Sequence, residues 1–139
     1  MRGNNSSLFL FQTKDPGALY CDREYPENAI LGTTIETNKH HPGVSRAPKV
    51  WERFIAMLEL DAEKTFLSVE PIMRFDPKPF FRWITAMEPG YGVAIGYDNY
   101  NHKLPEPPKQ QVLDLINDLE NCGIKVYKKT IRKAWWQAP

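Results

Sequence analysis

Phe66-Leu67-Ser68-Val69-Glu70-Pro71, residues 66–71, is a short apolar run that ends in a carboxylate and a proline. Such a run is typical of a buried strand, and Pro71 stops it because proline has no N–H to give to a neighbouring strand. Downstream, apolar residues recur at spacings of three and four between Phe80 and Met87, which predicts an amphipathic helix. This strand–helix unit is the pattern from which the rest of the fold follows.

The same unit recurs along the whole chain. Leu8–Gln12 is expected to be a strand buried on both faces, and Asp15 is expected to cap a short helix that starts at Pro16. Gly123 suits the position after the last helix. The other expected strands are Ile30–Ile35, Val93–Gly96 and Ile124–Tyr127, and the expected helices run to about Cys21, from Lys49 to Leu60 and from Lys109 to Cys122. The order βαβαβαβαβ predicts an α/β fold with a parallel sheet or part of a barrel.

Two of these helices show which side faces the core. In the helix from Lys49 to Leu60, the inward positions are expected to be Trp51, Phe54, Ile55 and Leu58. In the last helix they are expected to be Val112, Ile116 and Leu119.

Composition places the chain among globular proteins. Its 139 residues, 42% hydrophobic and 25% charged, predict a single α/β domain over residues 1–139. Lys and Arg total 18 against 17 acidic residues, so the whole molecule has no field that would draw it to nucleic acid or a membrane. No apolar run approaches the ~20 residues that span a bilayer, and the first residues show no signal-peptide pattern. We therefore expect a cytoplasmic protein without a membrane partner.

Two cysteines, Cys21 and Cys122, lie far apart and outside any CxxC pair. Neither a disulfide framework nor a zinc site is indicated, and an iron–sulfur cluster cannot be built from this chain alone. His40 and His41 with Glu36 match no strong zinc signature, so we expect no metal site.

Polar residues follow every expected strand. Ligands of parallel α/β sheets bind beyond the carboxyl ends of the strands, so these residues are candidates for one shared site. The alternative is that they are the ordinary polar residues found where strands emerge into solvent. Glu70 directly follows a buried strand and could anchor a ligand amine or hydroxyl, or instead pair with a lysine to orient loops. The candidates are Thr13, Lys14, Thr34, Glu36, Ser68, Glu70, Asp98, Asn99, Lys128 and Lys129.

The tail, residues 128–139, is basic and aromatic. It belongs to a cluster that could grip phosphates and stack bases, or could be a solvated strand face followed by tryptophans that pack on the domain. The cluster is Lys125, Lys128, Lys129, Arg132 and Lys133, interleaved with Tyr127, Trp135 and Trp136.

Four strand-end motifs occur in the same order as in a phage-associated radical-SAM-like family, whose barrel is similar to that of spore photoproduct lyase. They are Phe9-Leu10-Phe11-Gln12-Thr13-Lys14-Asp15-Pro16, Ile30-Leu31-Gly32-Thr33-Thr34-Ile35-Glu36, Phe66-Leu67-Ser68-Val69-Glu70-Pro71 and Val126-Tyr127-Lys128-Lys129. The resemblance covers about Leu8 to Tyr127. Where the family usually has Gly-Gly-Glu-Ser after the fourth strand, this chain has Gly96-Tyr97-Asp98-Asn99.

The resemblance implies the carboxyl-terminal half of a TIM-type barrel. The family's three-cysteine motif lies in an amino-terminal half that this chain lacks, so a 4Fe-4S cluster would have to come from a partner chain. Glu36, Ser68 and Glu70 match the family's rim motifs and, with Asp98, would contact S-adenosylmethionine (SAM). The remaining strand-end residues would contact substrate: Thr13, Lys14, Thr34, Asn99, Lys128 and Lys129.

The leading hypothesis is therefore a truncated or split radical-SAM-like component that does not react alone. Half a barrel leaves the strand at Leu8–Phe11 with an unpaired apolar edge. A cluster-bearing amino-terminal half, or self-association through this strand, is expected to cover it. The alternatives are a non-catalytic module that binds nucleic acid through the basic-aromatic cluster, and a decayed fragment without activity.

Overall fold

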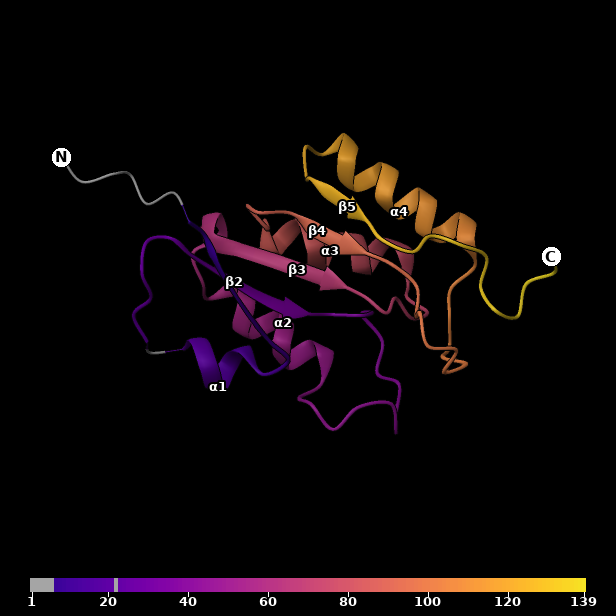
Figure 1. The fold of residues 1–139 in the computed structure, drawn as a ribbon, viewed down its shortest axis with the longest axis horizontal. Helices are drawn as coiled ribbons and strands as arrows, with labels where there is room; N and C mark the ends of the chain where they lie inside the picture. Colours follow the sequence, from indigo (N-terminus) through magenta and orange to yellow (C-terminus); the bar gives the residue numbers. More distant parts are fainter. Residues whose placement is uncertain (1–6, 22) are drawn as a thin grey trace.

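Strands and helices alternate along the chain in the order that the residue pattern predicts (Figure 1). The computed structural model describes residues 7–21 and 23–139. The strands are β1 (Phe9–Thr13), β2 (Ala29–Thr34), β3 (Thr65–Val69), β4 (Val93–Ile95) and β5 (Val126–Lys128). The helices are α1 (Pro16–Tyr20), α2 (Val50–Leu58), α3 (Pro77–Met87) and α4 (Lys109–Asn121), with a 3-10 turn, η1 (Ala62–Lys64), before β3.

The strands form one five-stranded sheet in the order β1-β2-β3-β4-β5, and every neighbouring pair is parallel. This confirms the predicted α/β class and the parallel sheet. Over the described residues the sheet is open, because β1 pairs only with β2 and β5 pairs only with β4.

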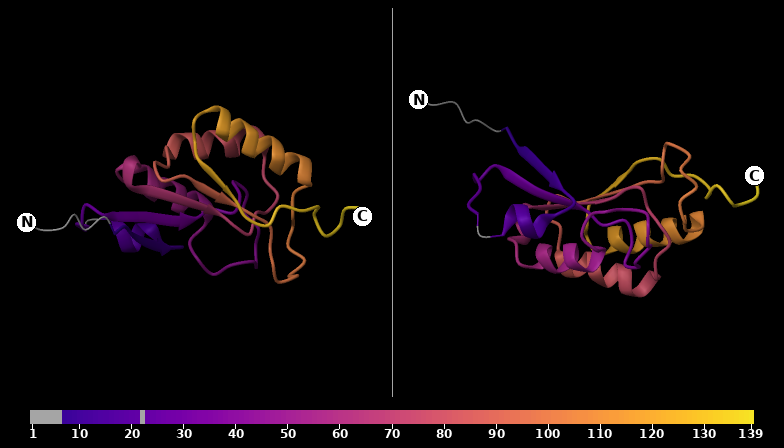
Figure 2. Two further views of the ribbon diagram at one scale, coloured as in Figure 1. Left: turned by 45° about the horizontal axis from the view of Figure 1, so that its top comes forward. Right: turned by 90° about the horizontal axis from the view of Figure 1, so that it is seen from below.

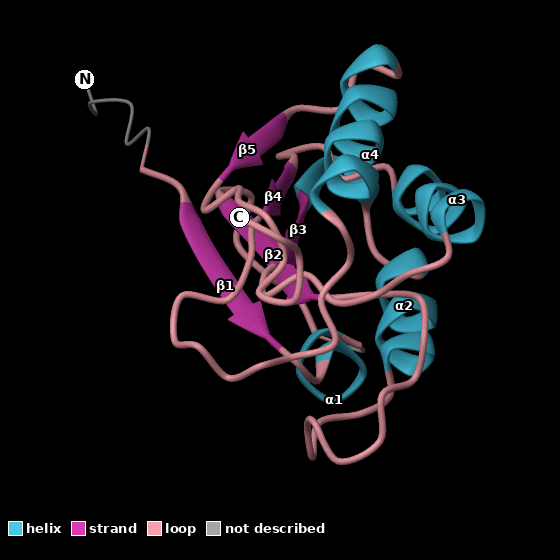
Figure 3. Cartoon of the chain, turned by 90° about the vertical axis from the view of Figure 1, so that its right-hand side faces the viewer, coloured by secondary structure: helices cyan, strands magenta, loops and turns pink. Residues whose placement is uncertain are grey.

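All four helices lie on the same face of the sheet (Figures 2 and 3). Sequential strand order with crossovers of one hand places each helix on that side. Leu67, Val69 and Ile95 of the sheet are buried there against helix residues such as Phe80 and Leu119. This layer is the hydrophobic core, and no described helix covers the opposite face of the sheet.

β1 differs from the expected strand buried on both faces. Leu8, Phe9, Leu10 and Phe11 are 54%, 52%, 54% and 39% exposed. The prediction was wrong because β1 is an edge strand with a single neighbour, so its apolar residues lack the cover that a central strand receives.

The buried side of α2 also differs from the expected one. Phe54 is buried as predicted, but Trp51, Ile55 and Leu58 are exposed, and the buried positions are Val50, Arg53, Phe54, Ala56 and Met57. The apolar residues of this helix lie on two adjoining stripes. Both stripes reach α3, where the ring of Trp83 stacks on the buried Phe54 at 4.5 Å and contacts the exposed Trp51 at 5.7 Å.

The ends of the other helices follow the sequence closely. Asp15 Oδ1 accepts a hydrogen bond from the backbone N–H of Ala18, with Pro16 at the first position of α1. Val112, Ile116 and Leu119 of α4 are buried as expected. Gly123 follows α4 with a φ of +83°, a conformation that glycine adopts without strain.

Tyr20 fixes α1 to the sheet edge. Its side chain is buried, and its hydroxyl lies 2.6 Å from the carbonyl oxygens of both Phe11 and Gly32, one on β1 and one on β2. Burial raises the pKa of Tyr20 to about 12. The hydroxyl therefore stays protonated and donates to these carbonyls.

No described helix is long and apolar enough to cross a bilayer.

Candidate functional site

The carboxyl ends of the five parallel strands point to one edge of the sheet (Figure 1). At this edge the loops after β2 and β4 line a pocket of about 600 Å³. Residues 39–50 form one wall and residues 102–105 the other, while Lys14, Glu36, Arg53, Pro71 and Met73 complete the lining. The pocket therefore lies where the topology of a parallel sheet predicts a ligand site.

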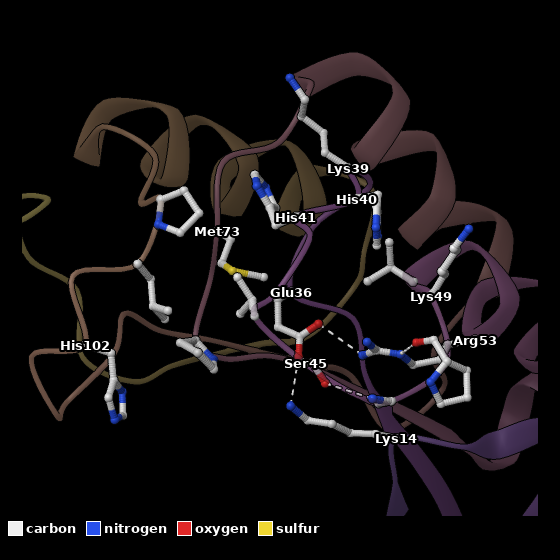
Figure 4. A pocket seen from close by; sticks show the side chains of 18 of the residues that line it. Lys14, Glu36, Lys39, His40, His41, Ser45, Lys49, Arg53, Met73 and His102 are labelled. Carbon is white, nitrogen blue, oxygen red and sulfur yellow. Dashed lines mark hydrogen bonds and ion pairs between the residues drawn. The ribbon is translucent and has the colours of Figure 1, made fainter.

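Glu36 lies at the base of this pocket between two cations (Figure 4). It is 4% exposed, and its Oε1 and Oε2 lie 3.1 Å from Lys14 Nζ and 3.0 Å from Arg53 Nη1. Both carboxylate oxygens are thus engaged within the protein. Glu36 consequently orients Lys14 and Arg53 toward the pocket, which is the loop-orienting role that sequence reasoning had considered for Glu70.

Arg53 is a site residue that sequence reasoning missed. It is 3% exposed; its Nε donates to the carbonyl of Pro48 at 2.8 Å, and its Nη1 donates to the carbonyl of Thr34 as well as to Glu36. A charged residue on the inward side of an amphipathic helix, flanked by Val50, Phe54 and Met57, was the available signal. Arg53 was overlooked because the predicted inward face was centred on Trp51, whereas the buried face of α2 contains Arg53.

A second pocket of about 450 Å³ adjoins the first, since Pro71 and His102 line both. Four of the predicted residues line it: Ser68, Glu70, Asp98 and Asn99. The structure thus brings together the predicted residues of β3 and of the loop after β4.

Glu70 is the uncommitted group of this second pocket. Its side chain is partly buried, and neither it nor the Ser68 hydroxyl forms a hydrogen bond or ion pair with a described residue. A Cβ built on neighbouring Gly96 would lie 3.3 Å from Glu70 Oε2 and 2.7 Å from Lys129 Cβ. Gly96 therefore leaves room for β5 and the Glu70 carboxylate to approach β4 closely.

Asp98 is buried, and its carboxylate is used by its own loop. The backbone N–H groups of Tyr100 and His102 donate to it at 3.1 and 2.8 Å, and the His102 ring contacts it at 3.1 Å. Burial alone would raise the pKa of Asp98, but these hydrogen bonds, first that of the His102 N–H, outweigh burial and lower the pKa. Asp98 thereby fixes the shape of the loop beside Glu70.

The other predicted residues divide between the two faces of the sheet. On the face that the helices leave open, Thr34 Oγ1 accepts a hydrogen bond from Gln12 Nε2 at 3.4 Å. In the loop after β4, Asn99 Oδ1 accepts a hydrogen bond from the Thr130 hydroxyl at 2.7 Å. Thr13 Oγ1 instead accepts from the backbone N–H of Asp15 at 3.0 Å and caps the turn before α1.

Lys128 and Lys129 point to opposite sides of β5. Lys128 Nζ lies 3.2 Å from Glu120 on α4, on the helix side, whereas the Lys129 side chain begins next to Gly96 and Glu70. Only Lys129 is therefore placed beside the rim pockets.

Much of the basic-aromatic cluster is engaged within the domain. Glu106, 1% exposed, receives both terminal nitrogens of Arg132, at 2.9 and 2.8 Å. The indole N–H groups of Trp135 and Trp136 donate to the carbonyls of Leu104 and Glu106. These contacts fasten the tail to the loop after β4, and Glu106 had no recognisable signal in the sequence. Binding of nucleic acid by the cluster stays a prediction.

Among residues 7–21 and 23–139, no group of three or more His, Cys, Asp or Glu side chains is placed to hold a metal ion. His41, a residue of the Glu36–His40–His41 pattern, turns its Nε2 to the carbonyl of Arg74 at 3.1 Å.

Comparisons of the chain with protein-family models, with curated proteins and with solved structures found no match.

Proposed function

We propose that this chain is the carboxyl-terminal half of a radical-SAM-like barrel enzyme and that it binds SAM in the pocket of Ser68 and Glu70. The observation that carries the proposal is Glu70, a partly buried carboxylate without a partner among the described residues. No fully buried side-chain oxygen of the described residues lacks a partner, so the Glu70 oxygens are open to the pocket. A carboxylate at the end of a strand that no internal donor engages is available to accept hydrogen bonds from a ligand.

The groups around Glu70 suit the parts of SAM. The ammonium group and ribose hydroxyls of SAM can donate hydrogen bonds to the Glu70 carboxylate. The Ser68 hydroxyl, in the same pocket, can donate or accept a hydrogen bond. Tyr100, 79% exposed, lies on the same rim and offers an aromatic face to adenine. A pocket of about 450 Å³ is large enough for a molecule of this size.

The open sheet supports the half-barrel part of the proposal. A barrel buries one sheet face against helices and fills the other with side chains from all its strands. Here the helices cover one face only, and the free edge at β1 carries exposed apolar residues. In this proposal a second half would pair with β1, fill the open face and bring the iron–sulfur cluster.

Calorimetric titration with SAM tests the proposal. The unaltered chain should bind SAM saturably, and Glu70→Gln should abolish or strongly weaken binding because a neutral amide loses the charge-assisted hydrogen bonds. Glu27→Gln is the matched control: Glu27 is exposed and precedes β2, at the opposite edge of the sheet. Equal affinity in all three proteins would contradict the proposal.

A further inference from the structure

The pocket of about 600 Å³ has a strongly cationic lining. The proposed SAM site at Glu70 lies in the adjoining pocket and leaves these cations without a ligand. Five of its lining residues are Lys or Arg and a single one is acidic: Lys14, Lys39, Lys49, Arg53 and Lys103 against Glu36. The pocket thus differs from the chain as a whole, whose positive and negative residues nearly balance. A local excess of cations around a concavity attracts anions.

Pairing inside the protein leaves part of this charge free. Glu36 pairs with both Lys14 and Arg53, so its single negative charge neutralises one of their two positive charges. The exposed Lys39 lies 3.6 Å from Asp76. Lys49 forms no ion pair with a described residue, and Lys103 Nζ lies over the Trp135 ring at 5.1 Å. These two lysines line the pocket from different loops, Lys49 from the loop after β2 and Lys103 from the loop after β4.

Arg53 contributes a donor that the protein leaves unused. Its Nε and Nη1 are occupied, whereas Nη2 donates to no described residue. No fully buried side-chain nitrogen or oxygen of the described residues lacks a partner, so Nη2 must be accessible to solvent. Arg53 lines the pocket and is held by hydrogen bonds to Pro48, Thr34 and Glu36. Figure 4 shows its contact with Glu36. A fixed guanidinium with one unpaired terminal nitrogen can donate to a phosphate oxygen.

The beginning of α2 adds to the same field. Lys49, Val50 and Arg53 line the pocket, so the first turn of this nine-residue helix lies beside it. Unpaired N–H groups give a helix N-terminus a partial positive charge that favours anions. The Glu52 carboxylate, which accepts the Lys49 N–H at 2.9 Å in the same turn, offsets part of this charge.

From this arrangement we propose that the pocket binds the phosphate group of a small phosphorylated substrate. Several cations on separate walls exceed what one carboxylate can satisfy, whereas a phosphate dianion presents three oxygens to them. The assignment of the ligand as a substrate rests on the proposed SAM enzyme, but the anion site itself does not. The two adjoining pockets would place the phosphorylated molecule next to SAM.

Titration with inorganic pyrophosphate at low salt tests the site. The double variant Lys49→Gln/Lys103→Gln should weaken binding at least about tenfold, because it removes two charge-assisted contacts. The double variant Lys64→Gln/Lys125→Gln makes the same change of net charge at the opposite edge of the sheet, where these residues precede β3 and β5. It should leave the affinity nearly unchanged.

The outcomes separate the alternatives. Equal weakening by the two double variants would show nonspecific attraction and overturn the site, as would an unaltered chain that does not bind pyrophosphate. Citrate, a tricarboxylate, should bind more weakly, and equal binding of citrate would overturn the phosphate assignment. Glu70→Gln should still bind pyrophosphate. Failure of the unaltered chain to bind SAM, with pyrophosphate binding intact, would therefore contradict the proposed function and leave the anion site standing.

Discussion

Replacement of Arg132 by methionine tests how the tail is held to the loop after β4. In the folded chain the Glu106 side chain is 2% exposed and that of Arg132 is 34% exposed, and the two share hydrogen bonds of 2.9 and 2.8 Å. Arg132→Met leaves the Glu106 carboxylate buried with only the backbone N–H of Trp135 as a donor. Breaking a buried pair in this way typically destabilises by about 3–5 kcal/mol.

The lower end of that range is expected here, about 3 kcal/mol, because the exposure of Arg132 lets water reach the vacated site. Urea unfolding followed by far-UV circular dichroism and by tryptophan fluorescence measures the loss. The fluorescence sums all four tryptophans, of which Trp135 and Trp136 lie in the tail, whereas circular dichroism reports mainly on the helices. Local release of the tail would separate the two signals, and global unfolding would keep them together.

Two further variants complete this experiment. Arg82→Met makes the same chemical change at an exposed position of α3 and should alter stability by less than about 0.5 kcal/mol. Glu106→Met/Arg132→Met replaces the pair with apolar side chains and should recover at least about 1 kcal/mol relative to Arg132→Met. Equal unfolding midpoints for Arg132→Met and Arg82→Met would refute the reasoning.

Three other changes address separate parts of the structure. Asp98→Asn should destabilise by about 1 kcal/mol at neutral pH, since it removes a carboxylate that accepts hydrogen bonds. Because the folded pKa of Asp98 is lowered from 3.8, this difference should persist above about pH 4 and disappear in acid unfolding curves as the pH falls through the lowered value. Tyr20→Phe should lower the unfolding free energy by about 1–2 kcal/mol, and the difference should close only as the pH rises toward about 12, where the native tyrosine ionises. Leu10→Asp should abolish concentration-dependent self-association in light scattering while Leu113→Asp, an exposed leucine on α4, does not; a native chain that stays monomeric would count against self-association through β1.

The order of elements could be predicted because it depends on local periodicity. Alternating short apolar runs and helical spacings are visible within ten to twenty residues, and the parallel sheet follows from the crossovers that they imply. The buried side of α2 could not be obtained in the same way. Apolar residues on a helix that packs on both a sheet and a neighbouring helix form two stripes, and periodicity alone does not rank them.

The sequence pointed to the strand-end residues of the rim but not to the ion pairs beside them. Polar residues at strand ends converge because parallel strands share an edge, and Ser68, Glu70 and Asn99 do line one pocket. Arg53 pairs with Glu36 and Arg132 with Glu106 across 17 and 26 positions of the sequence, separations that no local pattern reveals. The division of Lys128 from Lys129 was foreseeable, because consecutive residues of a strand point to opposite faces.

Two carboxylates of this chain separate the demands of folding from those of function. Glu106 has its oxygens filled by Arg132 and Trp135, so its charge stabilises the native structure. Glu70 has no such partner among the described residues, so the native structure gains no internal hydrogen bond from its charge. Glu70→Gln should therefore leave the unfolding free energy unchanged or higher even as it removes SAM binding, the trade-off that residues kept for a ligand show. A destabilisation as large as that of Arg132→Met would instead make Glu70 a structural residue and remove the main support for a SAM site at this rim.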